Sequence, residues 1–302
     1  MGDRGHLSTE GRNPKSVALD RMNIVDAFDL INAEDATVAT AVAAARADVC
    51  AAIELAAAAL AAGGRLIYAG AGTSGRLGVL DATECPPTFL TDPQMVQGII
   101  AGGPTALTRS VDGAEDRAEV GAKVIAEQEV SANDVVFGIA TGGTTPFVHA
   151  ALAEARRRGA KTVFLACVPK EQVADEADVS IRVITGPEVI TGSTRMKAGT
   201  ATKMVLNMVT TIAMVRLGKV YENLMVDVNT AANAKLVDRG TRIIQTVTGL
   251  DREAAQPLLD AAGGRVKTAL VMHARGLDRE AAERILAEVG GQVGRALGTT
   301  PR

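Results

Sequence analysis

The chain has 302 residues, enough to bury a substantial core in one large or two smaller domains, and a formal net charge of -3. Its Lys and Arg residues are spread along the sequence and its aromatic content is 2% with no Trp, which argues against a nucleic-acid-binding surface. The three cysteines and three histidines show no disulfide or metal-ligand spacing, so we expect reduced thiols, no metal and no cofactor.

A membrane segment is also not expected. The longest apolar helical pattern, near residues 204–217, is interrupted by Asn207 and two threonines, which makes it too short and too polar to span a bilayer. The N-terminal segment is charged from Asp3 onward and has no apolar signal core. We therefore expect a cytoplasmic protein without a membrane partner.

The first region, residues 1–55, is predicted to be an arm followed by a helix. Residues 1 to about 20 are polar and contain Gly, Asn and Pro, as is typical of a segment that orders only against something else. The alanine-rich stretch from Glu34 to Ala62 predicts one helix, which stops at Gly63-Gly64.

Residues 56–219 are predicted to form an α/β domain. Strand-like runs near 65–69, 95–101, 134–140, 161–167 and 178–184 alternate with helical segments, which predicts a doubly wound, mainly parallel five-stranded sheet. In the flavodoxin-like strand order, ligands bind beyond the carboxyl ends of the first and third strands.

Both of those strands lead into turns rich in glycine and hydroxyls. The first is followed by Gly70 to Gly75, with Gly72, Thr73 and Ser74, and it lacks the Gly-Lys-Ser/Thr ending of a nucleotide P-loop. Glycines let the backbone approach an anion, and hydroxyls favour the phosphomonoester of a small molecule. A glycine turn without a ligand is the alternative. The second turn carries the hydroxyls of Thr141, Thr144 and Thr145, and its agreement with the first strengthens the phosphate hypothesis.

Two glutamates near these turns are candidate catalysts. Glu84 precedes Pro86-Pro87, which we expect to end the helix and hold Glu84 on a stiff segment. Asp112 is a good N-cap, which would place Glu115 and Asp116 in the first helical turn, and a helical pattern follows from Arg117 to Glu127. Taken alone, Glu84 is equally a solvated surface residue, and Glu115 a complement to the helix dipole.

A third polar segment, Thr191 to Thr202, leads into a helix predicted over Met196 to Leu217. Ser193, Thr194 and Lys197 could contact the same ligand. The alternative is that the basic residues here, Arg195 included, are only the solvated start of that helix.

The C-terminal region, residues 220–302, is predicted to be helical and contains a duplication. Residues 249–270 realign with residues 276–297, with 13 of 22 positions identical. Each copy reads as an Asp N-cap, a helix, a Gly-Gly break and a second helix, so we expect two helical hairpins over 249–275 and 276–302. A lid or a dimer contact is a hypothesis for their role.

Four motifs together resemble one family, the N-acetylmuramic acid 6-phosphate etherases of the sugar isomerase (SIS) superfamily. They are GAGTSGRLGVLDATECPPTF from Gly70, DGAED from Asp112, TGSTRMKAGTATK from Thr191 and NLMVDV from Asn223. The second turn departs from the family's usual Ser-Gly-Arg-Thr-Pro, because Gly142 replaces the serine and Thr144 the arginine. Thr141 or Thr144 could substitute for the missing hydroxyl.

The resemblance implies a carbon–oxygen lyase of peptidoglycan recycling. The apolar helix near residues 204–217 and the N-terminal arm indicate at least a dimer, and we expect a homodimer. Such an enzyme removes D-lactate from carbon 3 of N-acetylmuramic acid 6-phosphate by elimination followed by water addition, and leaves N-acetylglucosamine 6-phosphate. Glu84 and Glu115 match the family's catalytic pair. A helix N-terminus favours an ionised carboxylate, so we expect Glu115 to be the base, and we expect drier surroundings to make Glu84 the proton donor.

Two other functions are compatible with a phosphosugar site. The glucokinase regulatory protein is similar in its motifs and would bind a phosphosugar without turning it over, although it has two SIS modules and this chain has room for one. A sugar-phosphate isomerase would also need an acid and a base near an aldehyde, but it would release no lactate.

Overall fold

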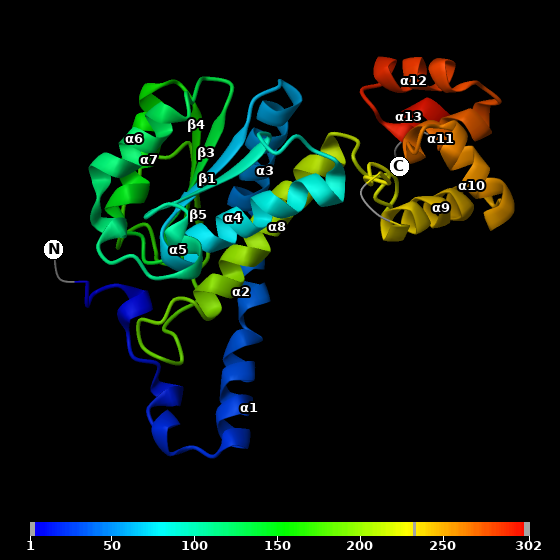
Figure 1. Cartoon of the computed structure of the whole chain (residues 1–302). Coiled ribbons are helices and arrows are strands. Elements are labelled where there is room, and N and C mark those ends of the chain that lie inside the picture. Colours follow the sequence, from blue (N-terminus) through cyan, green and yellow to red (C-terminus); the bar gives the residue numbers. More distant parts are fainter. Residues whose placement is uncertain (1–3, 232–233, 299–302) are drawn as a thin grey trace. The chain divides into compact units, whose positions relative to one another are not determined.

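The computed structural model describes residues 4–231 and 234–298. The chain forms two compact units (Figure 1): the first contains residues 1–82 and 94–210, and the second contains residues 83–93 and 211–302.

The first unit is built on a parallel sheet of five strands, as the sequence predicts. Its strand order is β2-β1-β3-β4-β5, and every neighbouring pair is parallel, so Tyr68 on β1 lies between Gly98 on β2 and Phe137 on β3. The central strands are buried on both faces, which explains their unbroken apolar runs. The strands are β1 (Leu66–Gly70), β2 (Val96–Ile100), β3 (Val135–Ile139), β4 (Lys161–Ala166) and β5 (Val179–Arg182).

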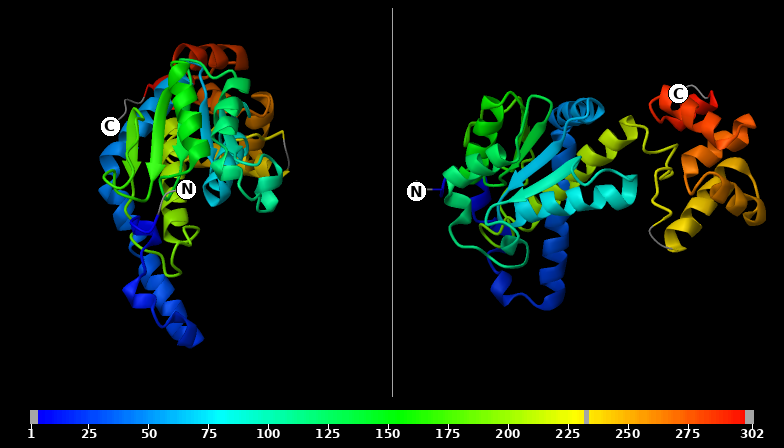
Figure 2. Two further views of the ribbon diagram at one scale, coloured as in Figure 1. Left: turned by 90° about the vertical axis from the view of Figure 1, so that its left-hand side faces the viewer. Right: turned by 45° about the horizontal axis from the view of Figure 1, so that its top comes forward.

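Helices cover both faces of this sheet. Helices α6 and α7 pack against each other on one face, and α3 lies on the other (Figure 2). The core under α7 joins Ile67 and Ala69 of β1 to Phe147 and Leu152. The helices of this part of the chain are α1 (Ile24–Asp35), α2 (Val38–Ala44), α3 (Arg46–Ala61), α4 (Gly72–Phe89), α5 (Thr105–Thr108), α6 (Ala118–Glu127), α7 (Pro146–Arg157) and α8 (Lys197–Arg216).

Two helix predictions are wrong. The stretch from Glu34 to Ala62 is not one helix, because α1 ends at Asp35 and α2 and α3 follow as separate segments. The Thr37 hydroxyl donates to the Glu34 carbonyl at 2.7 Å, a local bond that competes with helix continuation. Pro86 and Pro87 do not end α4, which continues to Phe89. They lie in its last turns, where their fixed φ suits a helix, and the amide of Leu90 still donates to the Pro86 carbonyl at 3.0 Å.

The N-terminal arm is ordered against the first unit. It contains three 3-10 turns, Ser8–Glu10, Pro14–Ser16 and Leu19–Arg21. Leu7 is 2% exposed and belongs to the core under α7, and Asn13 is also buried. The arm therefore contributes to the core of the sheet domain.

The second unit has its own helical core, and the predicted duplication forms two similar hairpins. Asp251 and Asp278 cap α10 and α12 by accepting bonds from the amides of Ala254 and Ala281, at 2.9 and 2.8 Å. Each Gly-Gly break has positive φ angles. The helices are α9 (Ala234–Thr248), α10 (Arg252–Ala261), α11 (Val266–Arg275), α12 (Arg279–Glu288) and α13 (Val293–Leu297).

Within the part of the chain that the structure describes, no single helix is long and apolar enough to cross a membrane. The segments Ile24–Ala44 and Arg46–Ala61 meet the length and hydropathy of a span only as a pair, and they are bent by 64° relative to each other.

The three thiols differ in accessibility, which predicts selective labelling. Cys50 is exposed, whereas Cys85 and Cys167 are buried. Burial, and next the charge of Glu188, raise the pKa of the Cys167 thiol to about 12, so it stays protonated and unreactive at neutral pH. We expect a disulfide reagent to label Cys50 alone in the native protein and all three thiols in denaturant. Rapid labelling of a second thiol in the native protein would contradict this burial.

Candidate functional site

The turn between β1 and α4 presents free backbone donors, as a phosphate site requires. Gly75 packs so close to Gly70 that a Cβ on Gly70 would lie 2.7 Å from the Gly75 nitrogen, and Gly72 has a left-handed φ of 52°. Helix α4 begins at Gly72, so the N–H groups of Gly72, Thr73 and Ser74 precede the first intrahelical bonds and have no acceptor within the helix.

A cavity of about 330 Å³ brings this turn together with Glu115. Gly72 and Glu115 both line it, and so do the two cations Arg76 and Arg109. Arg76 donates to the backbone carbonyls of Ala106 and Arg109, at 3.0 and 3.2 Å, so it fixes the cavity wall opposite the turn. Neither arginine was selected from the sequence. The available sequence signal was Arg76 itself, the basic residue directly after Gly75.

Glu115 is positioned by a short turn and not by the start of a long helix. It lies in a 3-10 turn, Ala114–Asp116, whose N-cap is Gly113 with φ of 68°, and α6 begins only at Ala118. The prediction that Asp112 caps this segment is therefore wrong, because the left-handed glycine starts the turn one residue later without a side-chain cap. The Glu115 side chain is half exposed, and its Oε1 lies 4.0 Å from Nη1 of Arg4 in the arm.

The second turn, after β3, is held through its backbone carbonyls, and the Thr145 hydroxyl makes no helix-capping bond. The Thr141 carbonyl accepts from the Cys167 amide at 2.8 Å, and the Gly143 carbonyl lies 2.6 Å from Nε2 of His149. Thr145 is the N-cap of α7 but makes no side-chain capping bond, and Thr144 and Thr145 are both half buried. His149 thus supports the second turn, a role that its sequence position does not indicate.

The third segment meets the first at helix α8. A Cβ on Gly199 would lie 3.5 Å from the Thr194 carbonyl oxygen and 3.6 Å from Cγ2 of Thr73. Thr73 and Thr194 are therefore neighbours across Gly199, as the hypothesis of a shared ligand requires. Ser193 and Thr194 are both half buried.

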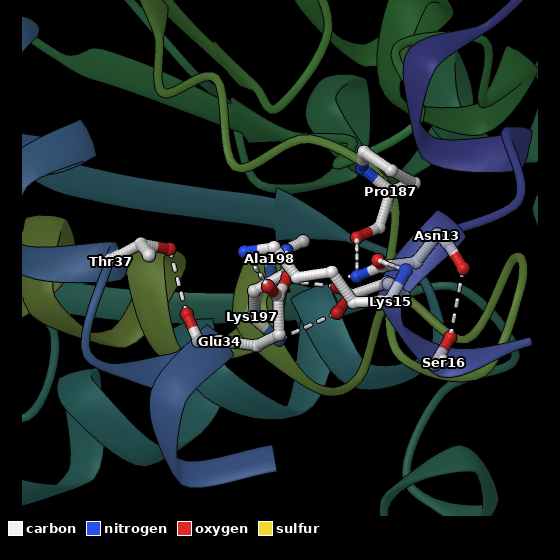
Figure 3. Close-up of polar contacts among 9 residues, drawn as sticks. Asn13, Lys15, Ser16, Glu34, Thr37, Pro187, Lys197 and Ala198 are labelled. Atoms are coloured by element: carbon white, nitrogen blue, oxygen red, sulfur yellow. Dashed lines mark hydrogen bonds and ion pairs between the residues drawn. The ribbon is translucent and has the colours of Figure 1, made fainter. Parts of the chain in front are cut away.

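Lys197 is enclosed in an ionic cluster (Figure 3). Its side chain is 3% exposed, and its Nζ donates to Oε2 of Glu34 at 2.6 Å. Glu34 also accepts from Lys15 and Asn13, each at 2.8 Å. Burial alone would raise the pKa of Glu34, but the bonds from Lys15, Lys197 and Asn13 outweigh it and lower this pKa to about 2.

Glu188 fixes the start of α8 beside that cluster. It is fully buried, and its two carboxylate oxygens accept from the backbone amides of Lys197 and Ala198 at 3.0 and 2.9 Å. A carboxylate at a helix N-terminus satisfies donors that have no intrahelical acceptor. Neither Glu188 nor Glu34 was selected from the sequence. Glu34 lies 163 positions from Lys197, and no local pattern links the two.

Glu84 belongs to the second unit, within residues 83–93. Its side chain is exposed, while the next residue, Cys85, is buried. The expectation of drier surroundings for Glu84 is therefore wrong within this chain, because α4 continues through this segment and turns Glu84 outward. Among residues 4–231 and 234–298, no group of three or more His, Cys, Asp and Glu side chains is arranged to hold a metal ion.

Comparisons with known proteins match most of the chain. Residues 48–156 match the family model of the glucokinase regulatory protein N-terminal SIS domain, and residues 120–212 match that of the SIS domain. The chain is 56% identical over 273 residues to the N-acetylmuramic acid 6-phosphate etherase of a Synechocystis species, covering 90% of this chain and 89% of the relative. It is 57% identical to the etherase of that name from Gloeobacter violaceus, again over 273 residues, with 90% and 89% covered.

A solved structure of a protein from E. coli CFT073 is also similar to this chain. Its TM-score is 0.47 at 15% sequence identity, and the match covers 67% of this chain and 97% of that one.

Proposed function

The chain belongs to the N-acetylmuramic acid 6-phosphate etherase family, and from that premise we propose that it cleaves the lactyl ether of N-acetylmuramic acid 6-phosphate. The resemblance expected from the four sequence motifs is thereby confirmed. The products of the proposed reaction are N-acetylglucosamine 6-phosphate and D-lactate, as in the recycling of cell-wall amino sugars.

The single observation that best supports this proposal in the structure is the cavity shared by Gly72 and Glu115. A turn with free backbone N–H groups suits the phosphate, and a carboxylate in the same cavity suits proton transfer on the attached sugar. We propose that the phosphosugar is bound by Gly72, Thr73, Ser74, Thr141, Thr144, Thr145, Ser193 and Thr194.

Lys197 also belongs to the proposed set, but its role is to position neighbouring residues. Because its ammonium is bound to Glu34, we propose that it acts by holding the segment that carries Ser193 and Thr194 against α1. The buried carboxylate of Glu188 supports the same segment from the backbone side.

The proposed reaction is an elimination followed by hydration. Once the sugar ring is open, the carbon 1 aldehyde acidifies the proton on carbon 2, and Glu115 removes that proton. The electron pair forms the carbon 2–carbon 3 double bond as the carbon 3–oxygen bond breaks, and Glu84 protonates the departing lactate oxygen. Water then adds across the double bond, with its oxygen on carbon 3 and a proton returned to carbon 2.

We further propose a cytoplasmic homodimer. The free cysteines fit a reducing compartment. Helix α1 exposes three large apolar side chains on its outer surface, Ile24 at 89%, Val25 at 66% and Phe28 at 66%, which favours their burial against a second copy.

A lactate assay tests the proposed function. Incubating the purified protein with N-acetylmuramic acid 6-phosphate should release D-lactate and N-acetylglucosamine 6-phosphate in equal amounts. In water enriched in ¹⁸O, the label should enter the sugar and not the lactate, because elimination breaks the carbon 3–oxygen bond. Substrate consumed without lactate would indicate an isomerase, and binding without consumption would indicate a sensor.

A further inference from the structure

The N-terminal arm approaches the proposed phosphosugar site. Nη1 of Arg4 lies 4.0 Å from Oε1 of Glu115. Glu10 approaches the third polar segment, because a Cβ on Gly192 would lie 3.0 Å from Glu10 Oε2. The arm is fixed beyond these contacts by Asn13, which donates to Glu34 in the Lys197 cluster (Figure 3).

Within this arm, Thr9 carries a hydroxyl that the protein does not satisfy. Thr9 is 0% exposed, and its Oγ1 has no hydrogen-bond partner among the described residues. The neighbouring Ser8 Oγ is buried and unsatisfied as well. Leaving a buried donor unpaired is unfavourable, so such a group indicates a partner that is absent from the free chain.

The Thr9 hydroxyl lies beside Gly142, one of the two glycines of the second turn. A Cβ added to Gly142 would meet a single neighbouring atom within 4 Å, Oγ1 of Thr9, at 3.8 Å. Thr9 therefore brings a hydroxyl from the arm to the place where the turn lacks one.

We infer that Thr9 is a substrate-binding residue whose hydroxyl donates to an oxygen of the phosphosugar held on the turn at residues 141–145. This inference rests on the proposed function of the site. Because the hydroxyl is enclosed in the free chain, the arm or the turn shifts locally to admit the ligand, and the arm then closes on it. Amide hydrogen exchange in residues 5–12 should accordingly slow when ligand is bound.

The test is the pair Thr9→Val and Thr9→Ser. Valine has nearly the shape of threonine without the hydroxyl, so removal of an unsatisfied donor should leave the melting temperature unchanged or raise it. The same change should raise KM by about 10- to 100-fold, as expected for a lost hydrogen bond to a charged group, while kcat changes little. Thr9→Ser keeps the hydroxyl and should retain a KM close to that of the original chain.

Two further variants separate ligand binding from a general effect of buried hydroxyls. Thr91 is also buried with an unsatisfied Oγ1 but lies outside the proposed site, so Thr91→Val should leave KM unchanged. The space beside Gly142 admits a serine, and Gly142→Ser combined with Thr9→Val should restore much of the lost affinity.

Titration calorimetry with N-acetylglucosamine 6-phosphate measures the binding affinity directly, without turnover. Thr9→Val should weaken this binding by a similar factor, and equal affinity in the two proteins would overturn the inference. If the original chain releases no lactate, the proposed etherase activity fails, and the calorimetric comparison still decides the role of Thr9.

Discussion

Replacing Glu115 or Glu84 with glutamine is expected to lower the rate of lactate release by about a hundredfold to ten-thousandfold. Glutamine has nearly the same size as glutamate but can neither take a proton from carbon 2 nor deliver one to the lactate oxygen. The loss should appear in kcat, with KM little changed, because these carboxylates act on the transition state and the binding turns remain intact. Steady-state kinetics with a lactate assay measure both parameters.

The two variants should differ in their pH dependence. If Glu115 is the base, Glu115→Gln removes the acidic limb of the pH–rate profile, and Glu84→Gln removes the alkaline limb. The opposite pattern would exchange the two roles. Glu119→Gln is the matched control, because Glu119 is an exposed carboxylate near Glu115 in sequence that pairs with Arg117 at 3.3 Å.

The fold was predictable because its signals are local. Each buried strand is a short apolar run bounded by turn residues, and the five strands lie within two residues of their predicted bounds. The Asp caps and Gly-Gly breaks of the C-terminal hairpins are also local, and both appear in the structure. The prolines of α4 show the limit of such reasoning, because a local stop signal near a helix end does not fix where that helix ends.

The supporting residues of the site were not predictable because their contacts are distant in sequence. Lys197 and Glu34 are 163 positions apart, and nothing in either local pattern indicates the pair. The same holds for Thr9 beside Gly142 and for Arg4 beside Glu115. The glycine turns were identifiable, since their chemistry lies in consecutive residues, whereas supporting side chains such as His149 come from other segments.

Lys197→Met is expected to destabilise the first unit by up to about 3–5 kcal/mol, the usual effect of removing one partner of a buried ion pair. Both side chains are nearly inaccessible, at 3% for Lys197 and 6% for Glu34, so water cannot replace the lost ammonium, and the remaining carboxylate keeps only its bonds from Lys15 and Asn13. Lys197→Arg keeps the charge and should lose less. Hydrogen exchange of the β1 and β3 amides in increasing urea measures the stability of this unit.

Replacing both partners distinguishes a lost pair from a packing defect. The double variant Glu34→Met/Lys197→Met removes the buried carboxylate together with its buried ammonium partner, so it should be more stable than Lys197→Met alone. If the two substitutions instead destabilise additively, the pair contributes only through packing.

The same cluster predicts how stability depends on pH. The pKa of Glu34 is about 2 in the folded chain, below its ordinary value of 4.5, so the carboxylate contributes stability above pH 4.5 that is lost as the pH falls toward 2. This contribution is on the order of 3 kcal/mol. Glu34→Gln should be less stable at neutral pH and should flatten the decline between these two values. An equally steep acid transition in that variant would assign the decline to other carboxylates, such as Asp134, whose pKa is also lowered because the hydrogen bonds from Arg65 outweigh its burial.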